Sequence, residues 1–342
     1  MRIWAAETYL RRGNVPKGQQ QLEKLRAMDL TSGEEAEVAY LTARRMLLEE
    51  QIEEAEARWR EVAQGEHAPS RARARFVMIE RDLAADRISR EEAIARMERL
   101  RFAWRGDEFE AVLLNRLADL YLAGEKYRKG LETLEQAAAH LPGTPQAEGS
   151  AERMREVFTR LFLDGKADSM PPVKALALYE DFRELTPPGD RGNELIAKLA
   201  DRLVDVDLLT RAADLLEGQV RHRLSGEAKA RTGARLASIH LLNRAPEKAV
   251  TALNASRSER MSPSLLSKRR HLRARALLAA DRPAAALTPV SGDTSPEAAR
   301  IRAKIHAEQG DWAKAADNLA QLLPEPPGGD DGLSKAAADK VM

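Results

Sequence analysis

The sequence predicts an all-α fold built from repeated antiparallel helix pairs. Ala, Leu, Glu and Arg dominate while aromatic residues make up only 4%, a composition that favours helices over sheets. Apolar side chains recur at spacings of three and four residues along most of the chain, which is the period of a helix buried on one face. The same size pattern also returns at intervals typical of a helix-pair repeat. A chain of 342 residues can bury a large core, in one extended repeat domain or two compact ones.

The clearest copy of the repeat runs from Ala111 to Thr144. Its residues alternate by size across two helices and an interruption: Leu114, Leu117, Ala118, Tyr121, then Gly124 and Glu125, then Tyr127, Gly130, Leu134, Ala137, and finally Pro142. The small residues Ala118 and Gly130 allow two antiparallel helices to approach closely, and the large ones fill the space beside them. One pair cannot bury its own face, so further copies are expected on both sides.

This segment resembles the tetratricopeptide repeat (TPR), a pattern of about 34 residues with the same order of size classes. Gly130 stands where the family usually has Ala. The resemblance extends over residues 1 to 323, most fully at this one copy. It implies a right-handed superhelical solenoid of about eight to nine helix pairs and the role of a scaffold or adaptor.

Looser copies precede this one. Two pairs lie near the start, and their repeat positions are Ala6, Tyr9, Gly13, Val15, Gly18 and Leu22, then Ala43, Met46, Ile52, Ala55, Trp59 and Val62. The next pair carries Phe76, Ile79 and Leu83 followed by Ala93, Met97 and Leu100. Ser89 and Glu92 have the spacing of a capping box, which predicts the start of a helix there.

Further copies follow past the middle of the chain. Their repeat positions are Leu199, Ala200, Leu203, Leu209, Ala212 and Leu216; Leu236, Ala237, His240, Pro246, Ala249 and Leu253; Ala274, Leu277, Asp281, Pro283, Ala286 and Val290; and Ala303, His306, Gly310, Trp312, Ala315 and Leu319. Pro16, Pro246 and Pro283 fit the first turn of a second helix, where the missing N–H has no partner to lose.

The repeat register is interrupted once. Between Glu152 and Leu185 two helices are expected, but the connection from Gly165 to Pro172 is too long for a tight turn. The predicted organisation is therefore an N-terminal stack at 1–146, an irregular pair or joint at 147–190, a basic C-terminal stack at 191–323 and a flexible tail at 324–342.

Composition and spacing argue against catalysis. There is no cysteine, and none of the six histidines stands at metal-ligand spacing. His240 and His306 fall on packing positions of a first helix, so we interpret both as core residues. No Gly-rich phosphate loop is present either. An enzyme hidden in the irregular pair would have only Asp168, Glu180 and Asp181, without a partner base. We therefore predict no enzyme, no catalytic residue, no cofactor and no metal.

The two ends and the arginine bias bear on origin and compartment. The first thirteen residues contain no apolar signal-peptide core, and no stretch predicts membrane insertion. Most of the 55 basic residues are Arg, which we interpret as the mark of a GC-rich bacterial genome. Because Met1 falls inside a predicted helix, we expect a piece of a longer protein. It would be periplasmic if a signal sequence preceded it and cytoplasmic otherwise.

The predicted site lies on the basic C-terminal stack. Residues 221 to 282 carry 15 basic and 4 acidic side chains. The TPR resemblance implies that first helices line a concave groove, and on this basis the partner-binding residues are Arg231, Lys268, His271, Arg275, Arg300 and Lys304. Leu241, Leu242 and Leu278 would lie beside them. The corresponding earlier positions are mixed or acidic: Asn115, Asp119, Glu194, Asp201 and Asp205.

A basic groove with an apolar floor suits another protein or an acidic, partly apolar peptide. The alternative is that the arginines are solvated or pair with acids of neighbouring repeats, although Ser267 to Arg275 contains no acid. Nucleic acid is the second hypothesis, and the absence of Phe, Trp and Tyr from Arg221 to Arg282 argues against single-strand stacking. Self-association stays open.

The chain also resembles bacterial TPR scaffolds of the cell envelope, including those around flagellar motors. The segment that carries this resemblance is Met170-Pro171-Pro172, which interrupts the repeat. It implies a structural role in such an assembly.

Overall fold

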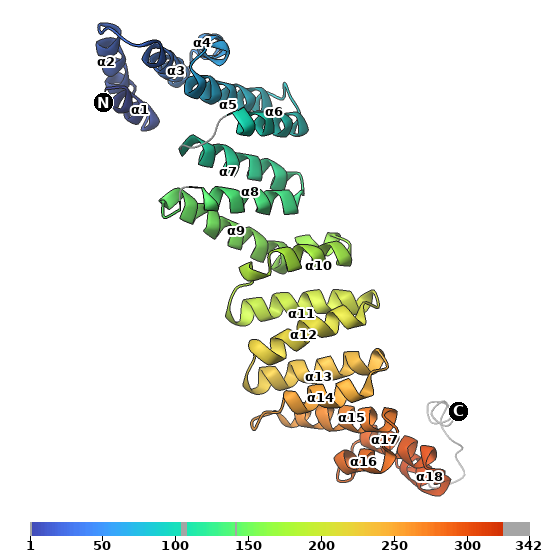
Figure 1. The fold of residues 1–342 in the computed structure, drawn as a ribbon. Helices are drawn as coiled ribbons and strands as arrows, with labels where there is room; N and C mark the ends of the chain where they lie inside the picture. The colour runs from blue at the N-terminus through green and yellow to red at the C-terminus, as the bar shows by residue number, and fades with distance from the viewer. Residues whose placement is uncertain (1, 104–107, 141, 324–342) are drawn as a thin grey trace, which may run out of the picture. The chain divides into compact units, whose positions relative to one another are not determined.

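The computed structural model describes residues 2–103, 108–140 and 142–323 (Figure 1). These residues form eighteen α-helices and three short 3-10 helices, and no strand is found among them. The predicted all-α fold of TPR-like antiparallel helix pairs is confirmed. The handedness of the superhelix and the number of repeats stay predictions.

The chain divides into two compact units, residues 1–158 and 159–342, here called the N-terminal unit and the C-terminal unit. The helices up to the division are α1 Arg2–Arg11, α2 Val15–Arg26, α3 Ser32–Leu48, α4 Ile52–Gln64, α5 Ala68–Ala84, α6 Arg90–Ala103, α7 Glu108–Ala123, α8 Tyr127–Ala139 and α9 Pro145–Leu163, which crosses it. Those after it are η1 Lys166–Ser169, α10 Pro172–Asp181, η2 Arg183–Leu185, α11 Gly189–Asp205, α12 Leu209–His222, α13 Gly226–Leu242, α14 Pro246–Ala255, α15 Pro263–Ala279, α16 Pro283–Leu287, η3 Thr288–Val290, α17 Pro296–Glu308 and α18 Trp312–Ala320.

Eight helix-to-helix turns share one backbone geometry. In each, a residue with positive φ follows the first helix: Gly13, Glu50, Asp86, Glu125, Asp207, Arg244, Asp281 and Gly310. The next N–H then closes the helix end, as where the Lys126 N–H donates to the Tyr121 carbonyl at 2.9 Å. This hydrogen bond satisfies a carbonyl that the end of the helix leaves without a partner. The identical closures are what give the pairs a common hairpin shape.

The pair α7 and α8 packs as the sequence predicts. The two helices run side by side in opposite directions (Figure 1). Ala118 and Leu134 are fully buried between them. A Cβ on Gly130 would lie 2.6 Å from a terminal carbon of Leu122, so any larger residue at this position would require the Leu122 side chain to move. The pair with the clearest repeat pattern is therefore also closely packed.

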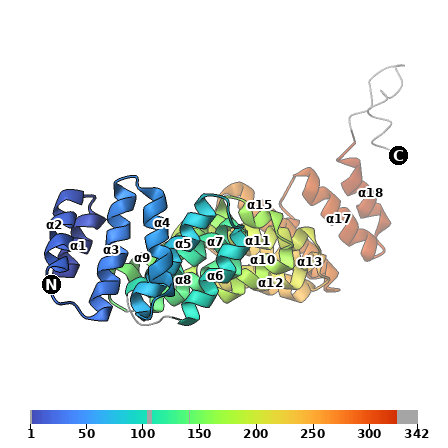
Figure 2. The ribbon, with the colours of Figure 1, turned by 90° about the horizontal axis from the view of Figure 1, so that it is seen from above.

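Within each unit, the first helices of successive pairs stack on one another. Contacts join α1 to α3 and α3 to α5 in the N-terminal unit, and α13 to α15 and α15 to α17 in the C-terminal unit. Second helices lie against their own first helices, as α4 does beside α3 (Figure 2). Buried apolar residues such as Trp59 and Leu113 fill the space between these layers. Side chains on the outer face of the first helices are left to form a shared surface.

The irregular pair has the long connection that its sequence predicts. The 3-10 helix η1 lies between α9 and α10, and Gly165 precedes it with φ of 81°. Pro172 begins α10 and costs no hydrogen bond there. Phe162 packs edge-on against Tyr179 across this connection, with ring centroids 6.2 Å apart. The domain boundaries predicted at 146 and 190 stay a prediction, and the predicted tail at 324–342 lies outside the described residues.

Among the described residues, no helix has the length and apolar character needed to cross a lipid bilayer.

Candidate protein-binding groove

Three first helices of the C-terminal unit, α13, α15 and α17, line two adjoining depressions of about 740 and 500 Å³. Ser238, Leu272, Arg275 and Glu297 belong to both, so the two depressions form one surface, here called the C-terminal groove. The larger volume lies within the range of about 300 to 1,000 Å³ typical of ligand sites. The groove is thus large enough to take several side chains of a partner.

The floor of the groove is apolar. Its apolar lining consists of Leu241, Leu242, Leu272, Leu278, Ala279 and Ile301. Leu242 is 63% exposed, so most of this large aliphatic side chain is open to water. Three of these leucines are the ones that the sequence places beside the basic residues. A partner that covers Leu242 would remove its apolar surface from water.

The structure brings five of the six predicted residues to this groove. Lys268 and His271 line one depression, Arg300 and Lys304 line the other, and Arg275 belongs to both. Arg231 lines neither depression. Its side chain is 74% exposed and pairs with Glu227 one turn away on α13 at 3.2 Å. A part of the predicted set is therefore a contiguous surface, and Arg231 lies apart from it.

Two arginines of the groove are held by one carboxylate. Glu297 pairs with Arg275 of α15 and, at 3.6 Å, with Arg300 on its own helix α17. Pairing with an acid of a neighbouring repeat was the competing interpretation of these arginines, and it is what Arg275 does. Its charge is therefore partly neutralised before any partner arrives.

The two lysines of the groove differ from its arginines. Lys268 and Lys304 are both exposed, and neither has an ion-pair partner among the described residues. They lie on different helices, one in each depression. Glu308 also lines the larger depression, one turn after Lys304 on α17, and no ion pair joins the two. Lys268 and Lys304 are therefore the groove cations that no carboxylate of the described residues contacts.

The basic run from Lys268 to Arg275 does not form one continuous surface. Arg269 is 93% buried and points inward, where its guanidinium donates to the carbonyl of Leu253 at 2.6 Å and to Ser256 at 3.1 Å. Arg273 donates to Asn254 Oδ1 at 2.7 Å. A phosphate backbone needs a row of accessible cations. This arrangement removes much of the support for the nucleic-acid hypothesis.

Ser267, His271 and Asp293 meet at one edge of the groove. Asp293 Oδ2 lies 2.8 Å from His271 Nε2 and accepts a hydrogen bond from Ser267 Oγ at 3.2 Å. In a serine-hydrolase triad the acid and the serine contact opposite nitrogens of the imidazole. Here both lie against Nε2, since Ser267 Oγ is 3.5 Å from the same atom. The cluster is arranged as a link between α15 and the loop before α17.

Asp293 also organises the start of α17. Its Oδ1 accepts the Ser295 N–H at 2.9 Å, and Ser295 in turn caps the helix through the Ala298 N–H. Hydrogen bonds from Ser295 and from His271 hold the pKa of Asp293 well below its usual range. Sequence reasoning missed both Asp293 and Glu297. The signal was an acid 22 residues downstream of His271 and of Arg275, at the start of the next first helix.

The predicted acidic positions of earlier first helices are tied to their neighbours. Asp119 of α7 pairs with Arg153 of α9, and Asp201 of α11 pairs with Arg235 of α13. Glu80 of α5 pairs with Arg116 of α7 at 2.8 Å in the same way. The remaining members of the set are Asn115, Glu194 and Asp205. Asn115 is hydrogen-bonded to Ser150, and Glu194 pairs with Lys198. Asp119, Asp201 and Glu80 therefore link successive first helices, whereas Glu194 pairs within its own helix α11.

The histidines at repeat positions are packed. His240 is 8% exposed, and burial lowers its pKa, which favours the neutral imidazole. Nδ1 of His240 and of His306 is buried without a hydrogen-bond partner among the described residues. In the irregular pair, Asp168 pairs with Arg202 at 3.7 Å. No cluster of three potential metal ligands occurs in the described part of the chain.

The helix pairs and the groove define a TPR-like helical-repeat protein. No protein-family model matches the chain, and no curated protein matches it. Solved structures that are similar to it include the apo form of RapI, at 11% identity over 94% of this chain and 95% of that one, with a TM-score of 0.39.

Two further similar structures are those of a TPR repeat-containing protein and of a quorum sensor. The C-terminal part of a TPR repeat-containing protein from Cytophaga hutchinsonii is 16% identical over 78% of this chain and 99% of that one, with a TM-score of 0.34. The apo quorum sensor NprR from B. thuringiensis is 10% identical over 94% and 96%, with a TM-score of 0.35. Identities and TM-scores this low do not indicate what the protein does. Its function is inferred from the residues of the groove.

Proposed function

We propose that the protein is a non-catalytic interaction scaffold that binds an acidic, partly apolar segment of a partner protein in the C-terminal groove. The observation that carries this proposal is a pair of exposed lysines without ion-pair partners among the described residues, Lys268 in one depression and Lys304 in the other, where Lys304 shares the lining with the exposed Leu242. Charge complementarity sets the approach and register of a partner, while burial of the leucine floor supplies affinity. The groove offers both properties on rigid helices.

The partner would also exchange ion pairs within the groove. A carboxylate of the partner can compete with Glu297 for Arg275 and Arg300 at little cost, because both arginine side chains are more than half exposed. Lys268 and Lys304 need no such exchange. We therefore expect the two lysines to contribute more to binding than the two arginines.

The first experiment is a pull-down from the source cells with the wild-type chain and the variant Lys268→Glu/Lys304→Glu. The matched control is Arg231→Glu, since Arg231 is equally basic and lies on α13 outside both depressions. Circular dichroism checks that all three chains keep their helix content. We expect the double variant to lose a protein that the wild type and the control both retain.

Binding of that protein should weaken by about tenfold or more in the double variant, which corresponds to about 1.4 kcal/mol. Retention of every partner by Lys268→Glu/Lys304→Glu would refute the groove as the binding site. Equal loss in Arg231→Glu would show a general effect of charge and would also count against it.

We further propose that this scaffold belongs to a bacterial cell-envelope assembly such as a flagellar motor. Support for this step comes only from the resemblance noted at Met170-Pro171-Pro172. Fractionation of the source cells with an antibody against the chain tests it. The protein should be found in the periplasm or with the envelope, and a purely cytoplasmic protein would overturn the step while leaving the groove proposal standing.

A further inference from the structure

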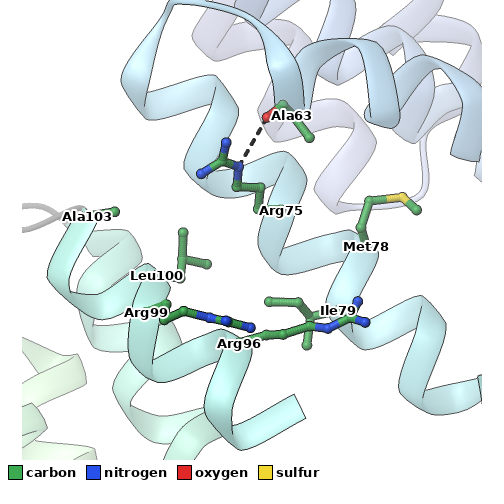
Figure 3. Close-up of a pocket in the computed structure, with 8 residues that line it drawn as sticks. All are labelled: Ala63, Arg75, Met78, Ile79, Arg96, Arg99, Leu100 and Ala103. Atoms are coloured by element: carbon green, nitrogen blue, oxygen red, sulfur yellow. Dashed lines mark hydrogen bonds between the residues drawn. The ribbon is translucent and has the colours of Figure 1, made fainter. Parts of the chain in front are cut away.

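Another depression lies in the N-terminal unit, where α5 is flanked by α4 and α6. It measures about 320 Å³ and is lined by Ala63, Arg75, Met78, Ile79, Arg96, Arg99, Leu100 and Ala103 (Figure 3). It is here called the arginine pocket. First helices α13, α15 and α17 line the C-terminal groove, whereas the second helices α4 and α6 supply five of these eight residues. The two sites therefore use different helix layers.

The polar lining of the arginine pocket consists of three guanidinium groups. Arg75 belongs to α5, and Arg96 and Arg99 belong to α6. Figure 3 shows Leu100 between Arg75 on one side and Arg99 on the other. The lining contains no hydroxyl, amide or carboxylate side chain. Any polar group that enters the pocket therefore meets donors of a single kind.

Two of the three guanidinium groups lack a compensating carboxylate. Arg75 Nε donates to the Ala63 carbonyl at 3.1 Å, which fixes its position without neutralising it. Arg99 is exposed and has no hydrogen-bond or ion-pair partner among the described residues. Only Arg96 is paired, to Glu92 at 2.7 Å and to Asp82 at 3.2 Å. The pocket thus has an excess of positive charge near an apolar surface.

Arg96 is positioned by a network that reaches the core. Asp82 holds Arg96 and also accepts from Arg87 Nε at 2.8 Å. Arg87 in turn pairs at 3.0 Å with Glu56, which is 6% exposed. A guanidinium fixed in this way loses little conformational freedom when a ligand binds. The network therefore makes one wall of the pocket rigid.

The floor determines what kind of anion fits. Met78, Ile79 and Leu100 line it, and Leu100 and Ile79 are largely buried in the core below. An apolar side chain of a ligand could pack on Met78, whose flexible thioether adapts to different shapes. The volume is near the lower end of the range for ligand sites. One large side chain with an adjacent carboxylate would fill it.

We propose that the arginine pocket is a second binding site, which takes a partner peptide segment carrying a carboxylate next to an aliphatic or aromatic side chain. Charge complementarity with Arg75 and Arg99 selects the acid, and the floor selects the apolar neighbour. Guanidinium groups bind carboxylates through two parallel hydrogen bonds, which favours a planar acid. The site is independent of the C-terminal groove and of the function proposed for it.

The experiment uses the full chain and a blocked peptide of sequence Glu-Leu-Phe-Glu, with a diazirine analogue in place of leucine. After irradiation, mass spectrometry locates the cross-links on the chain, and anisotropy of a labelled version gives the affinity. The control peptide is Gln-Leu-Phe-Gln, which has the same shape without the charge. The variants are Arg75→Glu/Arg99→Glu, the matched charge reversal Arg26→Glu on α2, and Lys268→Glu/Lys304→Glu in the groove.

We expect cross-links on α4, α5 or α6 with the acidic peptide. They should fall by about tenfold in Arg75→Glu/Arg99→Glu and stay within about twofold in Arg26→Glu and in the groove variant. The neutral peptide should bind at least about tenfold more weakly. Cross-links on α13, α15 or α17 report on the groove separately, so failure of one site does not imply failure of the other.

Three results would overturn the proposal. The first is the absence of cross-links at α4 to α6 with the wild-type chain. The second is equal labelling of this region by the neutral peptide, or after reversal of Arg75 and Arg99. The third is displacement of the peptide by inorganic phosphate at an equal concentration, which would identify a simple anion site.

Discussion

Among the described residues, each unit buries one charged Glu or Arg side chain at a junction of helices, and the two charges are stabilised in opposite ways. In the N-terminal unit the buried group is the carboxylate of Glu56, surrounded by the guanidinium groups of Arg60, Arg81 and Arg87 at 3.0 to 3.2 Å. In the C-terminal unit it is the guanidinium of Arg269, which has backbone carbonyls and a hydroxyl around it but no carboxylate. The first is a salt-bridge cluster, and the second is a hydrogen-bond cluster.

Glu56 joins α4 to α5 and to the turn before α6. Burial alone would raise its pKa, but hydrogen bonds from Arg87 and Arg81 lower it below the usual range. Its three partners are partly exposed, so they remain solvated if the carboxylate is lost. The cluster therefore stabilises the junction while Glu56 is ionised. Removal of the carboxylate leaves no arginine charge buried without solvent.

Arg269 joins α15 to the end of α14 and to α13. It donates to the carbonyls of Leu253 and Ala230, and the Leu253 carbonyl lies in the last turn of α14, where intrahelical partners run out. A Cβ on Gly233 would lie 1.8 Å from Ser256 Oγ, so glycine is what allows the end of α14 to approach α13. The cluster depends on both a buried donor and a close helix contact.

The largest expected effect is that of Arg269→Met. Because the Leu253 carbonyl then stays buried without a donor, the free energy of unfolding should fall by about 3 kcal/mol. Chemical denaturation of the full chain measures the loss, and hydrogen exchange should place it in α13, α14 and α15.

The matched control is Arg270→Met, since Arg270 is the exposed neighbour on the same helix. It should change the free energy of unfolding by no more than about 0.5 kcal/mol. A loss in Arg269→Met that is no larger than in this control would contradict the role given to Arg269.

The next largest effect is that of Glu56→Gln. The amide keeps an oxygen for Arg81 or Arg87 but loses its charge and turns an N–H₂ toward Arg60, so the expected loss is about 1 to 2 kcal/mol. Hydrogen exchange should increase in α4, α5 and α6 and stay unchanged in α13 to α15.

Glu54→Gln serves as the control, because Glu54 is an exposed acid on the same helix. If the two variants unfold at the same denaturant concentration, the cluster does not stabilise the N-terminal unit.

The smallest expected effect is the change that pH produces in the stability contributed by Glu56. A carboxyl whose pKa is lowered in the folded state stabilises the fold above its unfolded pKa, and this stabilisation is lost as the pH falls through the lowered value. The difference in unfolding free energy between wild type and Glu56→Gln should therefore shrink between about pH 6 and about pH 2.5. The difference between wild type and Arg269→Met should hold steady, because Arg269 keeps its proton throughout.

Denaturation of the three chains at both pH values measures these differences. A Glu56→Gln difference that does not change with pH would mean that its charge is not what stabilises the junction. A change in the Arg269→Met difference would place an acid-sensitive group in the second cluster.

The helix pairs were largely predictable because their signals are local. Size classes such as Ala118 and Gly130, and Pro at the start of a second helix, depend only on neighbours in sequence. The backbone conformation of the turns was harder to predict from the sequence. Six of the eight positive-φ positions are not glycine, among them Asp86 and Arg244, so composition alone does not mark them.

The groove was predicted in part, and the limits have a physical reason. A helical period places Lys268, Arg275 and Lys304 on outer faces, and their apolar neighbours follow from the same spacing. Whether a cation is paired depends on acids that another helix supplies. Arg275 of α15, for example, pairs with Glu297 of α17. The arginine pocket was not predicted at all, because it combines residues of a first helix with residues of two second helices, and the repeat pattern places only first helices along the groove.

The sequence by itself therefore determined the all-α repeat architecture, since helix pairing depends on residues a few positions apart. It also determined that one end of the chain is basic. Only the tertiary structure decided that Arg269 is buried while Lys268 is exposed. Neighbouring residues on a helix point in different directions, and the surface each one meets belongs to a helix that is distant in sequence.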